Sequence, residues 1–435
     1  MKLAEKILAR ASGRDEVTAG EIVVANVDGL VMHDLSSYLT SKVYEERIGL
    51  PVRYPERVTV VFDHTFSPAD ESTADVLVHD RAWAKRHNLN LYDCGSGNIH
   101  HVVARGGHAR PGGVIVGSDS HTPVYGALGA IAVALGNDSH ASMVLPYGKA
   151  WFRVPETVHV TLTGQLPAGT TARDIALWLT GQIGEGGAVY KALQFEGEWI
   201  ESASFWDRWL LPLITVDVGA KCGLIEPDEK TLSFMAGVPG AASGTDHEPL
   251  RGDAGDVSER WSYDVSELEP QVACPPTVGN VKNVADAGGR EIGWAELGGH
   301  GGGRIEDLRL AVEVLRRAPR HPDVRFNIVP SSRQVMAQAL DEGLVAELHA
   351  AGATFFPPST GSNQAVNMGA MAAGEAMIST HSRNFPGRNG STESEMYLAS
   401  ALTVAASATQ GRITDPREVI SDARELAGVT AGVQS

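Results

Sequence analysis

Short apolar runs rich in β-branched residues alternate along this chain with segments of helical periodicity. The candidate strands are Val58–Phe62, Val114–Val116, Val158–Leu162 and Val324–Val329. Such alternation is typical of α/β proteins, in which helices cover mostly parallel sheets. The sequence therefore predicts an α/β fold with mostly parallel sheets.

Three segments show how the helices are specified. Thr170 or Thr171 can cap a helix, and apolar residues recur after them at spacings of three and four through Ile183. A second helix is predicted around Leu308–Leu315, with acidic residues at its start and arginines at its end, an order that the helix dipole favours. The next helix is predicted to begin at about Arg333 and to stop at Gly352.

The length of 435 residues predicts several domains. Breaks in the pattern near residues 154 and 285 divide the chain into 1–154, 155–285 and 286–435, which we expect to be three domains. The stretch at 236–260 is rich in Gly, Ala, Asp and Pro and is interpreted as an exposed loop.

Composition excludes several classes of function. With 36 Lys+Arg and 53 Asp+Glu, the net charge is −17, which argues against nucleic acid or an anionic membrane as the main partner. There is no apolar run of about 18 residues, and the first ten residues resemble a helix rather than a secretory signal. The three cysteines, Cys94, Cys222 and Cys274, are too scattered for a disulfide framework. A cytoplasmic protein is expected.

Polar residues gather where apolar strands end. One predicted strand runs into Asp63-His64, another is followed by Asp119-Ser120-His121, and His100 lies in a glycine-flanked segment between them. Ligands of open α/β sheets bind beyond the carboxyl ends of strands, so we expect one shared site. A carboxylate beside an imidazole makes a proton donor or a metal ligand. The alternative is that the carboxylates are turn or cap residues and the histidines are core residues.

A polar loop near the C-terminus carries two arginines, Arg383 and Arg388, separated by a Pro-Gly pair. Their guanidinium groups could bind a carboxylate or phosphate. Taken alone, this segment would be an exposed arginine loop. A nucleotide-binding interpretation of Gly298–Gly303 is weak, because the stretch lacks both a Lys-Ser/Thr ending and a Rossmann glycine spacing.

Together and in the same order, these segments resemble the aconitase superfamily, especially the large subunits of 3-isopropylmalate dehydratase and homoaconitase. The resemblance extends from about residue 31 to 416. It includes Asp63-His64, Gly95–His100, Asp119–Thr122 and the segment Arg383–Arg388. The position of a family glutamate falls on Asp217. The resemblance implies three α/β/α domains with mostly parallel sheets around a central cleft.

The activity implied is that of a hydro-lyase acting on di- or tricarboxylates. Asp63 with His64 would protonate the leaving hydroxyl. His100 with Asp217, and His121 with Asp119, would form pairs that hold the water. The positions implied for substrate binding are His33, Ser120, Ser382, Arg383 and Arg388.

The chain departs from the family pattern at the positions of an iron–sulfur cluster. Family members hold a [4Fe-4S] cluster on three cysteines, and the corresponding positions here are His300, Thr360 and Asn363. A family asparagine and a family glutamate are likewise replaced, by Leu213 and Gln194. Because thiolates are needed to hold such a cluster, none is expected to bind.

Three outcomes remain open, in this order of preference. The first is metal-free acid/base catalysis. The second is a mononuclear divalent metal such as Zn or Fe(II). Its ligands would come from His64, His100, His121, His300, Asp119 and Asp217. The third is a non-catalytic paralogue that binds a small acid or a partner.

The family's fourth, swivelling domain supplies a serine base and a loop that selects the substrate. Nothing before Ser435 resembles that domain. We therefore expect either a separate small subunit, as in the dehydratases, or a site in which a residue of this chain is the base.

Overall fold

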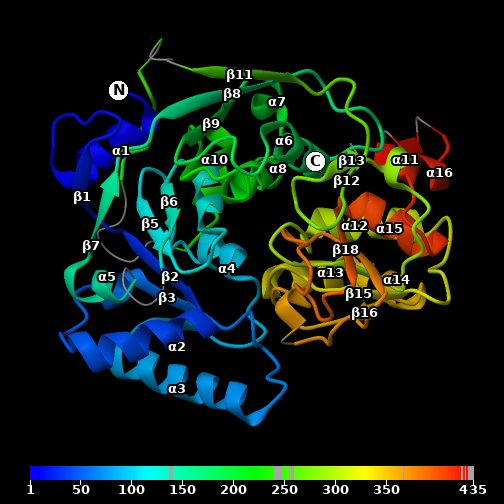
Figure 1. Cartoon of the computed structure of the whole chain (residues 1–435), viewed down its shortest axis with the longest axis horizontal. Helices are drawn as coiled ribbons and strands as arrows, with labels where there is room; N and C mark the ends of the chain where they lie inside the picture. The colour runs from blue at the N-terminus through cyan, green and yellow to red at the C-terminus, as the bar shows by residue number, and fades with distance from the viewer. Residues whose placement is uncertain are drawn as a thin grey trace. The chain divides into compact units, whose positions relative to one another are not determined.

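The computed structural model describes residues 1–136, 141–239, 247–253, 255, 259–365, 367–422, 425–426 and 428–429 (Figure 1). It is a mixed α/β protein with mostly parallel sheets, as predicted. Two compact units can be distinguished, and each is described by itself. Unit 1 comprises Met1–Cys94, Ile99–Thr163 and Gly186–Tyr263, and unit 2 comprises Gly95–Asn98, Gly164–Glu185 and Asp264–Ser435.

The largest sheet of unit 1 is five-stranded and entirely parallel. Its strand order is β4 (Asn90–Tyr92), β3 (Val58–Val61), β2 (Gly29–His33), β5 (Val114–Gly117) and β6 (Ile131–Ala134). Helices α2 (Asp34–Val43) and α3 (Glu71–His87) pack against each other beside β2–β4 (Figure 1). Every residue of β3 and β5 is buried, as expected of parallel strands covered on both faces. Because all five strands are parallel, their carboxyl ends lie at the same edge of the sheet.

Two smaller sheets complete the strands of unit 1. Strands β1 (Ile22–Asn26) and β7 (Lys149–Arg153) form an antiparallel pair. The other sheet has the order β10 (Cys222–Ile225), β9 (Ala192–Glu196), β8 (Thr157–Thr163) and β11 (Arg260–Asp264). The other helices are α1 (Leu3–Ser12), α4 (Ile99–Arg105), α5 (Ser142–Tyr147), α7 (Glu198–Ser202), α8 (Phe205–Arg208), α9 (Leu210–Leu213) and α10 (Glu229–Ala236).

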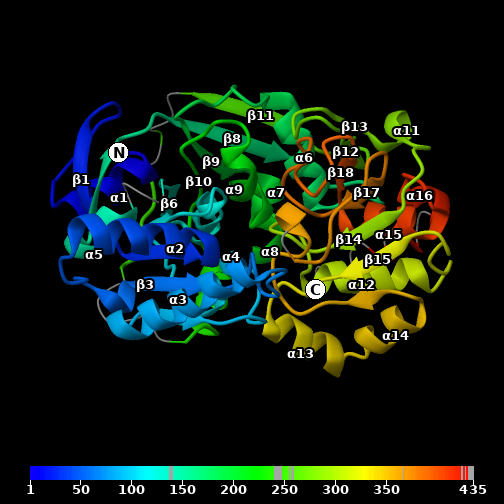
Figure 2. The same ribbon diagram turned by 60° about the horizontal axis from the view of Figure 1, so that its bottom comes forward.

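Unit 2 is built on a seven-stranded sheet. Its order is β13 (Val281–Asn283), β12 (Gln271–Ala273), β18 (Glu395–Ala399), β17 (Ala376–Ser379), β14 (Trp294–Leu297), β15 (Arg325–Ile328) and β16 (Thr354–Phe355). The strands from β18 to β16 are parallel, and β12 and β13 are antiparallel to their neighbours. The helices are α6 (Ala172–Ile183), α11 (Val284–Ala287), α12 (Ile305–Leu315), α13 (Arg333–Asp341), α14 (Leu344–Ala350), α15 (Ala401–Gln410) and α16 (Pro416–Val419). Helix α12 contacts α13, α14 and α15 (Figure 2).

The four predicted strands are confirmed as β3, β5, β8 and β15. Helix α6 begins after Thr171, one of the two predicted capping residues, whose hydroxyl accepts a hydrogen bond from the backbone N–H of Arg173. The single helix predicted from Arg333 to Gly352 is wrong in one respect. It is two helices, α13 and α14, because Gly343 between them has a left-handed backbone with φ of 76°.

Two predictions concern the organisation of the chain. The predicted loop at 236–260 lies in large part outside the described residues, and its described members form no helix or strand between α10 and β11. The three-domain division stays a prediction. Among the described residues, every helix is too short or too polar to cross a membrane.

Candidate active site

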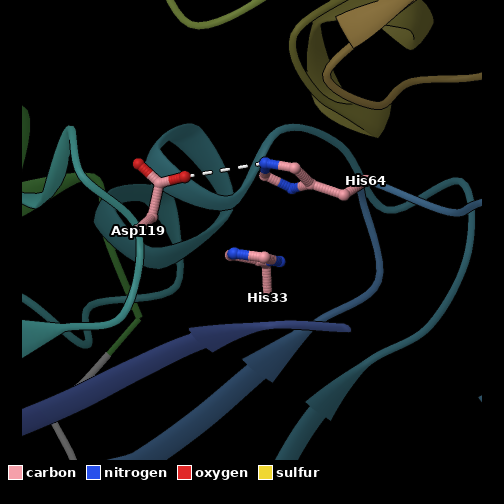
Figure 3. Close-up of side chains that lie close together, drawn as sticks. All are labelled: His33, His64 and Asp119. Atoms are coloured by element: carbon pink, nitrogen blue, oxygen red, sulfur yellow. Dashed lines mark ion pairs between the residues drawn. The ribbon is translucent and has the colours of Figure 1, made fainter. Parts of the chain in front are cut away.

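The carboxyl ends of β2, β3 and β5 bring together side chains from distant parts of the sequence. His33 is the last residue of β2, His64 follows β3, and Asp119 follows β5. In Figure 3 these three side chains lie close together. The rings of His33 and His64 stack with centroids 4.0 Å apart and an interplanar angle of 22°. The polar side chains at these strand ends therefore lie together within unit 1.

His64 lies between two carboxylates. Its Nδ1 is 2.8 Å from Asp63 Oδ1, and its Nε2 is 3.6 Å from Asp119 Oδ2. All three side chains are buried. Burial alone would lower the pKa of His64, but the surrounding carboxylates, chiefly that of Asp63, outweigh it and raise that pKa to about 9. His64 is therefore an imidazolium at neutral pH and can act as a proton donor.

Asp119 binds two further histidines through Oδ1. This atom accepts a hydrogen bond from His100 Nε2 at 3.0 Å and from the backbone N–H of His121 at 2.7 Å. His121 Nδ1 lies 3.8 Å from the same oxygen, and its Nε2 lies 3.7 Å from Asp217 Oδ2. The predicted pairing of His121 with Asp119 is thus found. His100 pairs with Asp119, which differs from the predicted pairing with Asp217.

Tyr125 contacts the far side of His100. Its hydroxyl is 3.3 Å from His100 Nδ1, and both side chains are fully buried. Burial, with the charges of Asp119 and Asp63, raises the pKa of Tyr125 well above its ordinary value, so the hydroxyl keeps its proton. The contact between His100 Nε2 and the Asp119 carboxylate, which can only accept, needs a hydrogen on Nε2, and the phenol can donate to Nδ1.

Asp34 supports the site from behind. Its carboxylate accepts hydrogen bonds from the backbone N–H of His64 at 3.3 Å and from both the backbone and the hydroxyl of Thr65. His33 Nδ1 lies 3.5 Å from Asp34 Oδ1. Burial pushes the pKa of Asp34 up, but the contact with His33, the positive charge of His64 and the hydrogen bond from the Thr65 hydroxyl bring it below its ordinary value.

The sequence predictions missed Asp34, Thr65 and Tyr125. Asp34 could have been found, because it directly follows His33 at the end of β2 and so repeats the pattern that identified Asp63-His64. Ser120, predicted to bind substrate, lies with its hydroxyl 3.2 Å from His121 Nδ1 and is partly exposed. His33 is partly exposed as well, so the site presents polar groups beside its buried acid–base residues.

The arginine loop, which we define as residues 380–390, follows β17 in unit 2. Arg383 and Arg388 are both partly exposed, and Ser382 is buried. Asn384 anchors the loop by donating to the backbone carbonyl of Ala273 at 3.3 Å. Arg388 also hydrogen-bonds Asn363 Oδ1. This loop presents two guanidinium groups on a well-anchored backbone.

Comparison with known proteins decides the family. The model of the aconitase family (aconitate hydratase) matches residues 5–292 and 282–411. The chain belongs to the aconitase family. The 3-isopropylmalate dehydratase large subunit 1 of Methanopyrus kandleri is 43% identical over 417 residues, which cover 95% of this chain and 98% of the relative. The probable methanogen homoaconitase large subunit of Methanothermobacter thermautotrophicus is 39% identical over 424 residues, covering 96% and 98%.

This membership makes the chain an aconitase-family hydro-lyase. Among solved structures, the holo-form of Thermococcus kodakaraensis aconitase X is similar to this chain. The match covers 82% of this chain and 84% of the aconitase X chain, with 12% identity and a TM-score of 0.49.

The residues at the cluster positions of this aconitase-family chain do not fit a [4Fe-4S] cluster. His300, Thr360 and Asn363 offer an imidazole, a hydroxyl and an amide, all buried, and His300 Nδ1 lies 3.0 Å from Asn98 Nδ2. Such a cluster needs thiolates. Burial raises the pKa of the Cys94 thiol to about 11 and that of Cys222 to about 12, and both residues belong to unit 1.

A mononuclear metal has candidate ligands within unit 1. Ligand atoms of His33, His64 and Asp119 lie within 4.8 Å of one another, and so do those of Asp34, Asp63 and His64. Two imidazoles and a carboxylate are a donor set that Zn or Fe(II) accepts. Since a metal-bound imidazole must be neutral, a metal would have to displace the proton of His64.

Proposed function

We propose that this chain is a cluster-independent hydro-lyase, which adds or removes water across a carbon–carbon double bond of a small di- or tricarboxylate or related hydroxyacid. The observation that carries the proposal is the buried His64, held between Asp63 at 2.8 Å and Asp119 at 3.6 Å. An imidazolium in this setting can protonate a poor leaving group, which is the task that elimination of water requires.

The proposed elimination proceeds as follows. A base removes the proton next to a substrate carboxylate, and electron density builds on that carboxylate. The neighbouring C–O bond breaks, and hydroxide leaves as water with the proton of His64. The proton that His64 delivers is the one on Nε2, because Nδ1 is held by Asp63. Positively charged groups beside the substrate stabilise the developing negative charge.

Four residues, His100, His121, Asp119 and Asp217, would order the reacting water. Asp119 accepts from His100 and from His121, and Asp217 lies 3.7 Å from the other nitrogen of His121. Imidazoles fixed in this way present defined donors and acceptors to a water molecule or to the substrate hydroxyl. His33, Ser120 and Ser382 are proposed as substrate contacts, and Arg383 and Arg388 are proposed to bind the substrate carboxylates.

A separate small subunit is the proposed partner. The relatives reported above are named as large subunits, which implies a small-subunit partner in the family. In this proposal the small subunit supplies the base that removes the substrate proton. A residue of this chain acting as base is the alternative, and assaying the chain with and without a co-expressed small subunit distinguishes the two.

The test is turnover in iron-free, chelator-treated protein. The substrates offered are hydroxydicarboxylates, including malate and 3-isopropylmalate, the compound named in the relatives, and formation of the unsaturated acid is followed by its ultraviolet absorbance. We expect turnover to survive chelation and to be abolished by His64→Asn. The partly exposed His321 serves as control, because His321→Asn leaves the site untouched. Loss of turnover on chelation, or normal turnover in His64→Asn, contradicts the proposal.

A mononuclear-metal hydro-lyase is the second candidate, favoured by the proximity of His33, His64 and Asp119. Elemental analysis separates it from the first. One zinc or iron per chain, lost together with activity on chelation and restored by the metal, supports the second candidate.

A further inference from the structure

Glu296 is a fully buried carboxylate in the middle of the unit 2 sheet. It lies on β14, between β15 and β17, and its strand neighbours Trp294, Ala295 and Leu297 are all fully buried. Taking a carboxylate out of water costs several kcal/mol unless other groups compensate it. The partners of Glu296 therefore identify what this residue holds in place.

One oxygen of Glu296 collects three donors from two loops. Oε1 accepts from the backbone N–H of Ser362 at 3.0 Å, from the hydroxyl of Ser362 at 3.0 Å and from His381 Nε2 at 2.8 Å. Ser362 belongs to the segment after β16, and His381 belongs to the arginine loop. Asn327 Nδ2, on β15, lies 3.5 Å from the other oxygen. The carboxylate thus joins three segments of unit 2.

These contacts reach both ends of the arginine loop. His381 lies two residues before Arg383 and is bound to Glu296 directly. At the other end, Asn389 follows Arg388 and donates from Nδ2 to the hydroxyl of Ser362 at 3.1 Å. Both arginines therefore lie between two residues that are anchored, directly or through Ser362, to one carboxylate.

Glycines enclose the network tightly. A Cβ added at Gly299 would lie 2.6 Å from His381 Nδ1, and one added at Gly361 would lie 2.5 Å from Glu296 Oε1. Both glycines have positive φ angles, of 75° and 78°. Because the backbone approaches the polar groups so closely, Glu296, Ser362 and His381 have little freedom to rearrange.

We propose that Glu296 is a positioning residue that holds Arg383 and Arg388 for carboxylate binding, acting through His381 and through Ser362 and Asn389. The network joins the same loops that carry Thr360, Asn363 and the arginines, where the donor set does not fit a cluster. In this chain a carboxylate–imidazole–hydroxyl network cross-links these loops. The inference rests on the proposed function only in that the arginines bind the substrate.

The experiment compares two substitutions of nearly equal size. Glu296→Gln keeps an oxygen that can accept the same donors, whereas Glu296→Met fills the space without an acceptor. We expect Glu296→Met to raise KM for the dicarboxylate about tenfold or more with a smaller change in kcat, because the arginines contribute binding. Glu296→Gln is expected to remain within about threefold of the wild type. Equal effects of Gln and Met overturn the proposal.

Amide hydrogen exchange provides a readout that needs no substrate. In Glu296→Met, exchange is expected to rise in residues 359–365 and 380–391, and in Glu296→Gln it is expected to stay near that of the wild type. Ser362→Ala should loosen the Asn389 end of the loop more than the His381 end. Glu375→Met is the control, since Glu375 lies beyond the other end of β17, partly exposed and paired with Arg325 at 2.7 Å.

The outcomes separate this inference from the proposed function. Unchanged exchange in Glu296→Met, or increased exchange with an unchanged KM, refutes the positioning role. If the exchange pattern is as expected but the wild type turns over no carboxylate, the proposed function fails. In that case Glu296 still anchors the loop, but the role of Glu296 in carboxylate binding is refuted together with the proposed function.

Discussion

Asp63→Asn tests the central feature of the candidate site, the protonated His64. The wild-type pKa of about 9, against an ordinary value of 6.5, is a shift of about 2.5 units. At about 1.4 kcal/mol per unit, the site favours the protonated ring by roughly 3 kcal/mol. Asp63 is the largest contributor to this rise. Removing its charge should lower the pKa of His64 by about 1 to 3 units.

The sign of the stability change follows from linkage. A histidine whose pKa is raised on folding stabilises the native state fully below its unfolded pKa, and that contribution is lost as pH rises through the folded value. The wild type should therefore lose roughly 3 kcal/mol of unfolding free energy between pH 6.5 and about 9. In Asp63→Asn this loss should shrink and move to lower pH.

The substitution has a second cost, which is independent of pH. Asp63 Oδ1 faces His64 Nδ1, and Oδ2 accepts from the backbone N–H of Ile99 at 2.7 Å. An asparagine has one oxygen for these two donors, so one buried donor loses its partner. This should lower the unfolding free energy by about 1–3 kcal/mol at every pH.

The assay is an NMR titration of the His64 ring, together with urea unfolding at several pH values. Asp323→Asn is the matched control, because Asp323 is exposed and lies beside the partly exposed His321. A wild-type His64 midpoint near 6.5, or one that does not move in Asp63→Asn, would refute the reasoning.

The remaining predictions concern the loops of unit 2 and the cofactor. Iron and acid-labile sulfide, assayed after anaerobic purification, should be far below stoichiometric, and about four of each per chain would contradict the expectation. Arg383→Lys should raise KM for the dicarboxylate about tenfold with little change in stability, because lysine cannot form the bidentate contact. Equal KM values would remove Arg383 from the site. Gly299→Ala should lower Tm more than Gly343→Ala, since both glycines have φ near 75°, but an added Cβ meets His381 at Gly299 and nothing within 4 Å at Gly343. Equal losses would show that backbone strain alone is responsible.

Prediction from sequence succeeded where a local pattern determines the structure. Asp63, His64 and Asp119 were predicted to lie together because they closely follow strands, and parallel strands bring their carboxyl ends to one edge. The partner of His100 was not predictable in this way. It depends on the rotamer of a residue on α4, which Tyr125 and Asp119 determine from distant positions.

Glu296 shows the other limit of the sequence pattern. A glutamate within the run Trp294–Leu297 looks like a solvent-facing strand residue, and its partners Ser362 and His381 lie 66 and 85 positions away. Only the parallel pairing of β14 with β15 and β17 brings their loops together. The family resemblance pointed to His300, Thr360 and Asn363, whereas the residue that hydrogen-bonds to both Ser362 and His381 is Glu296.

Asp119 has a consequence for how this site can change through mutation. Its two oxygens face His64, His100 and His121, so one carboxylate holds all three imidazoles in place. A substitution that moves one of these imidazoles therefore disturbs the others. Few residues at this end of the sheet can change independently. New substrate preferences are therefore more accessible to selection through other side chains, such as Ser120 or those of the arginine loop, than through the acid–base residues.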